Sequence, residues 1–418
     1  MSRYAKDRTK DNHPRPVKRI ELDEKRIGPR LLLAAALLAV GGLFIAYGIT
    51  QCKAVNDGWN IIPADSNADT ETAGEFTLLY ELGAGELDTV SENKALTVAY
   101  TDAIERATQL FSSITAYEGV VNLRYLSDHP NEELTVDATL YAAFGLFERY
   151  GNRDIFLAPI IDDYLSIFTA ADDTQVGYFD PRTNADVRAY FDEVLAFVQD
   201  PAHIRLELLG NNRVRLHVSA EYLAFCEKEG ITHLVDLGWM ENAFVVDAVA
   251  DALIAAGFTH GSLSSFDGFA RKLDTRADVT YQVDVLDREG SVAHLAASMV
   301  YPVETRSLVS LRTYGLGSPY DALRYYETAD GRRYFAYLDM ADGLCRAALP
   351  NLVCASETLG CAEMALVLAP VYIVDELDVA ALDALADAGI WHVRCEKKVL
   401  ICNGDARFTN LGEGYRVG

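Results

Sequence analysis

The chain has 418 residues, of which 50% are hydrophobic, and carries a formal net charge of −25 at pH 7. This length and hydrophobic content are enough for a large packed core, so a chain that is disordered throughout is excluded. The acidic excess repels phosphate backbones and anionic lipids, so nucleic acid is a poor candidate partner.

The chain begins with a basic segment, residues 1–30, which holds ten Lys or Arg against five Asp or Glu. Residues 31–49 follow without a single charged side chain. A helix of this length, at 1.5 Å per residue, nearly spans a hydrocarbon layer of roughly 30 Å. We therefore expect a transmembrane signal anchor over residues 31–50, with the tail 1–30 in the cytoplasm and later residues outside. A cleaved export signal is the alternative.

The part of the chain beyond the anchor is strongly acidic, with 27 basic and 57 acidic residues and a net charge of −30. Most of this charge is interpreted as a solvated surface coat. Residues 51–77 are low in apolar side chains and are expected to form a spacer, followed by an extracytoplasmic domain over residues 78–418. The seven cysteines are odd in number and show no zinc-site spacing, which favours buried free thiols over disulfides.

Hydrophobic periodicity in the first half of this domain favours a mixture of helices and strands. Alternating apolar and polar residues over 203–218, around Gly210-Asn211-Asn212, predict a hairpin. The other expected elements are a strand at 76–82 and helices at 95–114, 135–149, 162–169 and after Pro181.

Residues 233–271 carry the most informative pattern, which predicts a strand, a helix and a second strand. Residues 233–237 form the first apolar run, 244–253 have apolar side chains at helical spacing up to Gly257, and 261–266 form the second run. The elements expected after it are strands at 281–286, near Val300 and at 307–312, a helix at 381–388, and closing strands at 391–395 and 399–403.

The order and spacing of this unit resemble the core signature of the FAD:protein FMN transferases, the ApbE-type family. Asp236-Leu237-Gly238 match the Asp-Leu-Gly of that signature, Asp247 the last residue of its Lys-Gly-Tyr-Ala-Val-Asp motif, and Gly257 the glycine after its helix. Residues 151–160, 330–343 and 354–369 follow in the order of further family motifs, so the likeness covers roughly residues 95–402.

The resemblance implies an α+β, FMN-transferase-like (T-fold-like) domain with mixed and antiparallel sheets and packed helices, behind one N-terminal transmembrane helix. It also implies FAD, Mg²⁺ on the FAD diphosphate, and a target protein that receives FMN on a threonine. The family's flavin-site positions fall on Asn242, Asp247, Ser265, Asp267 and Asp339, and its metal position falls on Glu363.

Four departures from the family pattern fall at positions that carry its chemistry. Asn242 replaces a lysine, and Ser264-Ser265 replace paired glycines that allow close approach of the backbone to a nucleotide. Ala336 replaces a histidine, and Val367 replaces a threonine that would give an oxygen to the metal ion. Glu363 still offers a carboxylate to a hard cation. No catalytic residue is assigned.

Three functional hypotheses follow. The first is a single-pass protein of a bacterial cell membrane whose flavin and metal site is degenerate, a pseudoenzyme that binds or assembles with an extracytoplasmic partner. The second is an active, divergent FMN transferase with Glu363 and Asp339 or Asp342 converging beside Asp267 as metal ligands. The third is a noncatalytic carrier of flavin or another small ligand. Purely structural roles remain open for Asp236, Asp247 and Glu363.

Overall fold

A computed structural model describes residues 56–274, 276–404 and 406–418, which form one unit starting at Asn56. The predicted tail 1–30 and signal anchor 31–50 lie outside the described residues. Within the part that is described, no helix combines the length and the apolar character needed to cross a membrane.

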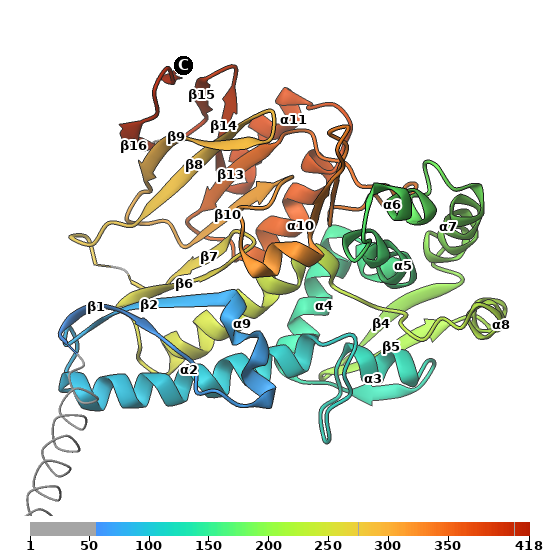
Figure 1. Ribbon diagram of the computed structural model, residues 1–418. Helices are drawn as coiled ribbons and strands as arrows, with labels where there is room; N and C mark the ends of the chain where they lie inside the picture. Colours follow the sequence, from blue (N-terminus) through green and yellow to red (C-terminus); the bar gives the residue numbers. More distant parts are fainter. Residues whose placement is uncertain (1–55, 275, 405) are drawn as a thin grey trace, which may run out of the picture. The chain divides into compact units, whose positions relative to one another are not determined.

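A nine-stranded mixed sheet forms the centre of this unit (Figure 1). The strand order is β1-β2-β6-β7-β10-β13-β14-β15-β17, in which all neighbours are antiparallel except the parallel pair β15 and β17. The strands are β1 Gly58–Ile62, β2 Phe76–Leu82, β6 Gly261–Ser265, β7 Phe269–Lys272, β10 Ser307–Arg312, β13 Asn351–Ser356, β14 Ile390–Glu396, β15 Val399–Cys402 and β17 Arg416–Val417. The first and last of these strands therefore form opposite edges of the sheet.

Three smaller sheets surround the central one. Their orders are β16-β9-β8, β3-β5-β4 and β11-β12. The strands are β3 Glu133–Thr135, β4 Ile204–Gly210, β5 Arg213–Val218, β8 Gln282–Glu289, β9 Val292–Val300, β11 Tyr325–Glu327, β12 Arg333–Phe335 and β16 Arg407–Leu411. Fully buried Val285 and Met299 of the β8-β9 sheet share an apolar core with Val353 and Val393 of the central sheet. Burial of this apolar surface holds the two sheets together.

Helices cover the central sheet near β6, β7 and β10. Helix α9 packs against β6 and β7 and also contacts α2 and α10, and Figure 1 shows it between α2 and these strands. The α-helices are α2 Thr89–Phe111, α3 Leu123–Asp128, α4 Ala138–Tyr150, α5 Ala158–Phe168, α6 Asp173–Phe179, α7 Ala185–Val198, α8 Ala220–Glu229, α9 Glu241–Ala255, α10 Cys361–Tyr372 and α11 Val379–Asp383. The 3₁₀ helices are η2 Ala68–Glu75, η3 Asp154–Leu157, η4 Gly238–Met240, η5 Pro319–Leu323 and η6 Ala384–Ala388.

The predicted fold class, an α+β domain with mixed and antiparallel sheets, is confirmed. The hairpin over residues 203–218 is also confirmed as β4 and β5, and Asn211 and Asn212 turn the chain with φ of 53° and 58°. Asn tolerates this left-handed conformation better than most residues, which is why the turn could be recognised.

The predicted strand at 233–237 is wrong, because the structure has no strand there. Main-chain groups of this segment bind to loops and side chains instead of a neighbouring strand: Leu234 N–H donates to Ser127 Oγ, and Asp236 N–H donates to Ile155 O. The unit that resembles the family signature is therefore an irregular segment, helix α9 and strand β6.

The folded unit also begins earlier than predicted, at Asn56 rather than residue 78. β1 pairs with β2 from Gly58 opposite Leu82 to Ile62 opposite Leu78, so residues 56–77 are part of the unit and not a spacer. Main-chain pairing of this kind needs few apolar side chains, which explains why composition suggested a linker. At the other end, β16 and β17 follow the predicted closing strands.

Candidate functional site

A cavity of about 300 Å³ lies where several residues of the predicted signature meet. Its volume is at the lower end of the roughly 300–1,000 Å³ that small-molecule sites occupy. Three carboxylates line it, and we call it the carboxylate cavity: Glu75, Asp236 and Glu241. The other lining residues are mostly apolar or aromatic: Ser113, Ile114, Ile161, Tyr164, Leu165, Phe168, Gly238, Trp239, Phe266, Pro319, Tyr320, Leu323, Arg324, Ala336 and Leu338.

The turn before α9 carries one wall of the cavity. Asp236 Oδ1 accepts the N–H of Gly238 at 2.5 Å, and Asp236 Oδ2 accepts the hydroxyl of Ser113. Gly238 has a φ of 56°, a conformation that glycine adopts without steric cost. Asp236 therefore shapes the turn that brings Trp239 and Glu241 to the cavity, in agreement with the structural role left open for it.

Three of the predicted flavin-site positions, Asn242, Ser265 and Asp267, bind one another beside the cavity. Asn242 Nδ2 donates to Asp267 Oδ2 and to Glu75 Oε2, both at 3.1 Å. Ser265 Oγ donates to Asp267 Oδ1 at 2.6 Å. The amide that replaces the family lysine is thus occupied by two carboxylates, and both oxygens of Asp267 already have donors.

Arg324 is the only Lys or Arg among the residues that line the cavity. Its Nη1 lies 3.4 Å from Asp267 Oδ2, and its guanidinium lies 5.4 Å from the centre of the Phe266 ring. Burial acts to lower the pKa of Arg324, but the charges of Asp267, Glu75 and Glu241 outweigh it and raise that pKa. This cation is held by the protein's own carboxylates.

Glu241, at the first position of α9, is the least satisfied carboxylate of the cavity. It accepts no hydrogen bond and forms no ion pair with any residue that the structure describes. Burial raises the pKa of Glu241 to about 8, and the nearby charge of Asp236 adds to this effect. Burial likewise raises the pKa of Glu75, although its hydrogen bond from Asn242 opposes the change. The surroundings of Glu241 therefore favour its protonated form.

One buried polar atom of a residue that lines this cavity has no partner. The indole N–H of Trp239, a side chain that is 5% exposed, finds no acceptor. The hydroxyl of Tyr164 interacts with Cys345, which does not line the cavity. Buried polar groups in folded proteins are nearly always hydrogen-bonded, so the orphaned indole N–H beside the cavity suggests a bound molecule that supplies the missing acceptor.

Asp247 does not line the carboxylate cavity. Its carboxylate accepts the N–H groups of Cys361 and Ala362, at 3.0 and 2.9 Å, where α10 begins. Arg271 Nη1 donates to Asp247 Oδ1 at 2.6 Å. This predicted flavin-site residue thus joins α9, β7 and α10.

The carboxylates proposed as metal ligands are bound by two arginines, one at Glu363 and one shared by Asp339 and Asp342. Glu363 Oε1 accepts Arg149 Nη1 and the hydroxyl of Tyr150, both at 2.8 Å. Asp339 and Asp342 both bind Arg346, at 2.7 and 2.6 Å. Across residues 56–418, apart from 275 and 405, no group of three or more His, Cys, Asp or Glu is arranged to hold a metal ion.

The residues around the cavity do not suit a flavin diphosphate with its metal ion. A diphosphate is held by cations, metal ions or free N–H groups. Here three carboxylates face the cavity, Arg324 is already paired, and the amide of Asn242 is occupied. Ala336 lines the cavity, so the family's histidine position faces it, but a methyl group cannot donate or accept a proton.

A second cavity, of about 320 Å³, brings two other family-like segments together. Asn152, Asp154 and Asp339 all line it. Burial raises the pKa of Asp154 to about 6, with the charge of Asp339 contributing. Asp339 thus lines this second cavity and not the carboxylate cavity.

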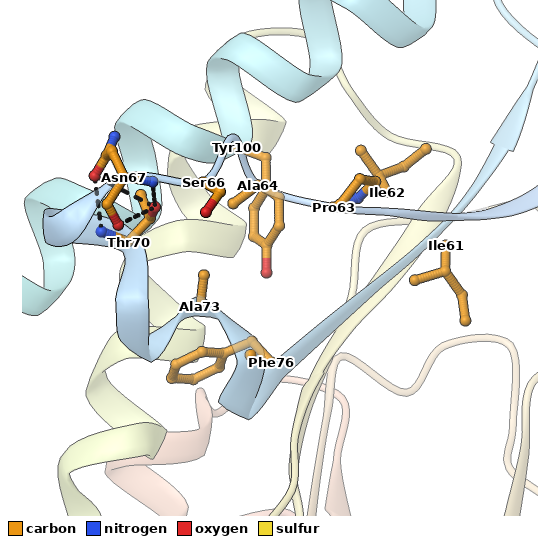
Figure 2. Close-up of a pocket in the computed structure, with 11 residues that line it drawn as sticks. Ile61, Ile62, Pro63, Ala64, Ser66, Asn67, Thr70, Ala73, Phe76 and Tyr100 are labelled. Carbon is orange, nitrogen blue, oxygen red and sulfur yellow. Dashed lines mark hydrogen bonds between the residues drawn. The ribbon is translucent and has the colours of Figure 1, made fainter. Parts of the chain in front are cut away.

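A third cavity, of about 560 Å³, lies among β1, η2 and α2 (Figure 2). The ring of Tyr100 projects into it, and its hydroxyl is buried without a partner. Ile61, Ile62 and Pro63 form an apolar side. None of the site residues predicted from the sequence lines this cavity.

The sequence did not single out Glu75, Trp239, Glu241 or Arg324. Glu241 carried a signal, since it is a charged residue at the start of a helix whose buried positions are almost all apolar. Trp239 lies beside the recognised Gly238. Glu75 and Arg324 reach the cavity from distant parts of the chain and carried no local signal.

Comparison with solved structures shows that the chain has the fold of the ApbE flavin transferases. The ApbE protein from Thermotoga maritima matches with a TM-score of 0.52 and 14% identity, over 80% of this chain and 93% of that one. The flavin transferase ApbE from Vibrio cholerae matches with a TM-score of 0.50 and 14% identity, over 81% and 93%. No family model and no curated protein matches the sequence. The resemblance seen in the sequence is confirmed for the fold.

Proposed function

We propose that this chain is a single-pass, outward-facing protein of a bacterial cell membrane that uses an FMN-transferase-type domain for binding or assembly, without transferring FMN. Flavin transferases with the same fold support the general class of site. The observation that carries the noncatalytic part is the set of carboxylates, Glu75, Asp236 and Glu241, around the cavity that the family signature encloses.

The charges around this cavity oppose phosphoryl chemistry. Phosphoryl transfer depends on positive groups that stabilise the charge on the phosphate oxygens. One charged carboxylate about 4 Å from a phosphate charge repels it by about 4 kcal/mol at an effective dielectric constant near 20. That repulsion equals the roughly 2.7–4 kcal/mol that one well-placed donor contributes to such a transition state. Arg324 is already paired with Asp267 and is not free to offset the carboxylates of Glu75 and Asp236.

The active-transferase alternative needs metal ligands that converge beside Asp267. Against it, Glu363 is bound by Arg149, and Asp339 is bound by Arg346. The flavin-carrier alternative needs no metal ion, but it needs room and donors for a flavin phosphate, and the same carboxylates oppose that ligand. Binding of a different molecule, or of a protein partner, agrees better with the lining of the cavity.

The test for FMN transfer uses purified protein mixed with FAD, Mg²⁺ and a threonine-containing target peptide. We expect no covalent flavin on the peptide by mass spectrometry and a colourless protein after purification. An active flavin transferase with the same peptide serves as the positive control. Covalent FMN on the peptide in the presence of this protein would refute the noncatalytic proposal.

The proposed topology is tested separately. Alkaline phosphatase, which is active only outside the cytoplasm, is fused after Gly418 in full-length protein, and a second fusion is made within the basic tail 1–30. We expect activity from the first fusion and none from the second. The reverse pattern would contradict the outward orientation.

A further inference from the structure

We propose that the carboxylate cavity binds a small organic cation, an ammonium group on an aromatic or apolar body, in place of a flavin nucleotide. This inference rests on the proposed function, because it names the ligand class of the same site. Its basis is the cavity's lining: carboxylates at Glu75, Asp236 and Glu241, and an aromatic and aliphatic wall between them.

The spacing of the carboxylates favours a molecular cation over a metal ion. Three carboxylates line one cavity, yet the described residues contain no group of acidic, His or Cys side chains close enough together to hold a metal. An ammonium group needs no such convergence, since one or two carboxylates and hydrogen bonds satisfy it. The remaining surface of the ligand then contacts apolar walls.

Aromatic side chains supply the second half of the recognition. Tyr164, Trp239, Phe266 and Tyr320 line the cavity. An organic cation within about 6 Å of an aromatic ring is attracted by the ring's electron density. Anionic ligands gain nothing from the same rings. The lining is therefore selective for a cation with an apolar body.

Two independent observations point to a ligand rather than to an acidic surface. The buried indole N–H of Trp239 has no acceptor. Glu241 has neither a hydrogen bond nor an ion pair within the described residues. A ligand with an ammonium group and one hydrogen-bond acceptor supplies partners for Glu241 and for Trp239.

Binding of a cation is expected to depend on pH through Glu241. Burial, together with the charges of Asp236, Glu75 and Asp267 and against that of Arg324, raises the pKa of this carboxyl to about 8. A bound ammonium stabilises the charged form of Glu241, so binding releases its proton. Affinity should therefore increase as the pH rises from about 6 to about 8.

The test is isothermal titration of purified full-length protein with three probes of similar size: benzylamine, benzyl alcohol and benzoate. We expect benzylamine to bind at least about tenfold more tightly than benzyl alcohol, and benzoate not to bind. Glu241→Gln should weaken benzylamine about tenfold. The control Glu221→Gln removes an exposed carboxylate from the first turn of α8 and should leave binding unchanged.

Ala336→Phe provides a second variant that fills the cavity and keeps every carboxylate, and it should abolish benzylamine binding. Equal binding of benzylamine and benzyl alcohol, normal binding by Glu241→Gln, or tighter binding of FMN than of benzylamine would each overturn the proposal. Failure to bind benzylamine together with absence of FMN transfer overturns this inference alone. Covalent FMN on a target peptide overturns the proposed function instead.

Discussion

Asp247 on α9 and Arg271 on β7 form a buried ion pair, with 2.6 Å between Asp247 Oδ1 and Arg271 Nη1. The same carboxylate accepts the first N–H groups of α10, from Cys361 and Ala362. An acidic group at a helix N-terminus satisfies free donors and favours the helix dipole. Of the two roles that the sequence left open for Asp247, this geometry supports the structural one.

Asp247→Ala is expected to lower the free energy of unfolding by about 3–5 kcal/mol, because it leaves a buried guanidinium without its inner partner. Arg271 is 2% exposed. The matched control is Asp251→Ala: Asp251 also binds Arg271, at 2.8 Å, but its side chain is 59% exposed. Asp251→Ala should lower the free energy of unfolding by less than about 1 kcal/mol. Urea unfolding measures both, and equal losses would contradict the structural role.

The sequence predicted those parts of the fold whose cause is local. The β4-β5 hairpin follows from alternating side chains around two asparagines that accept positive φ. The strand at 76–82 was found from its own pattern and is β2. Residues 233–237 have the composition of a strand, but strand formation also needs a neighbouring edge, and Ile155 and Ser127 take its main-chain groups instead.

The site shows the same division between local and distant causes. The signature located Asp236, Gly238 and Ala336, and all three line the carboxylate cavity. The hydrogen bond between Asn242 and Glu75 joins residues 167 positions apart, so no local sequence pattern predicts it. The charge of the cavity arises from such long-range contacts. The sequence could therefore show which positions depart from the family pattern, but it could not show that carboxylates gather around the cavity.

Gly268, which follows Asp267, lets β7 lie close to β10. It has a φ of 107°, and an added Cβ would lie 2.1 Å from the carbonyl oxygen of Ser310. Gly268→Ala should therefore lower the free energy of unfolding by more than about 3 kcal/mol, which is the upper end of the cost of backbone strain alone. Gly290→Ala is the control, because Gly290 has a φ of 61° and open space around it, and about 1–2 kcal/mol is expected. Thermal or urea unfolding compares the two variants. Similar losses of stability would show that β10 shifts to accommodate the added Cβ.

Two buried tyrosines should respond oppositely to loss of the hydroxyl group. The Tyr100 hydroxyl has no partner, so Tyr100→Phe should leave stability unchanged or raise it by up to about 1 kcal/mol. The Tyr334 hydroxyl donates to Asp180 Oδ2 at 2.7 Å, and Tyr334→Phe should cost about 1.5–3 kcal/mol because the acceptor is charged. Urea unfolding measures both variants. A clear loss in Tyr100→Phe would reveal a partner for that hydroxyl.

Glu241 should make the stability of the protein depend on pH. Its pKa is raised from 4.5 to about 8, mainly by burial, so the folded state binds the proton more tightly than the unfolded chain does. The stability gained in this way is fully present below about pH 4.5 and is lost as the pH rises through about 8. Glu241→Gln mimics the protonated form at every pH. We expect the variant and the wild type to be similar in stability near pH 4.5, and the variant to be more stable near pH 9. Urea unfolding across this range gives the difference, and a difference that stays constant with pH would show that Glu241 is not buried as the cavity requires.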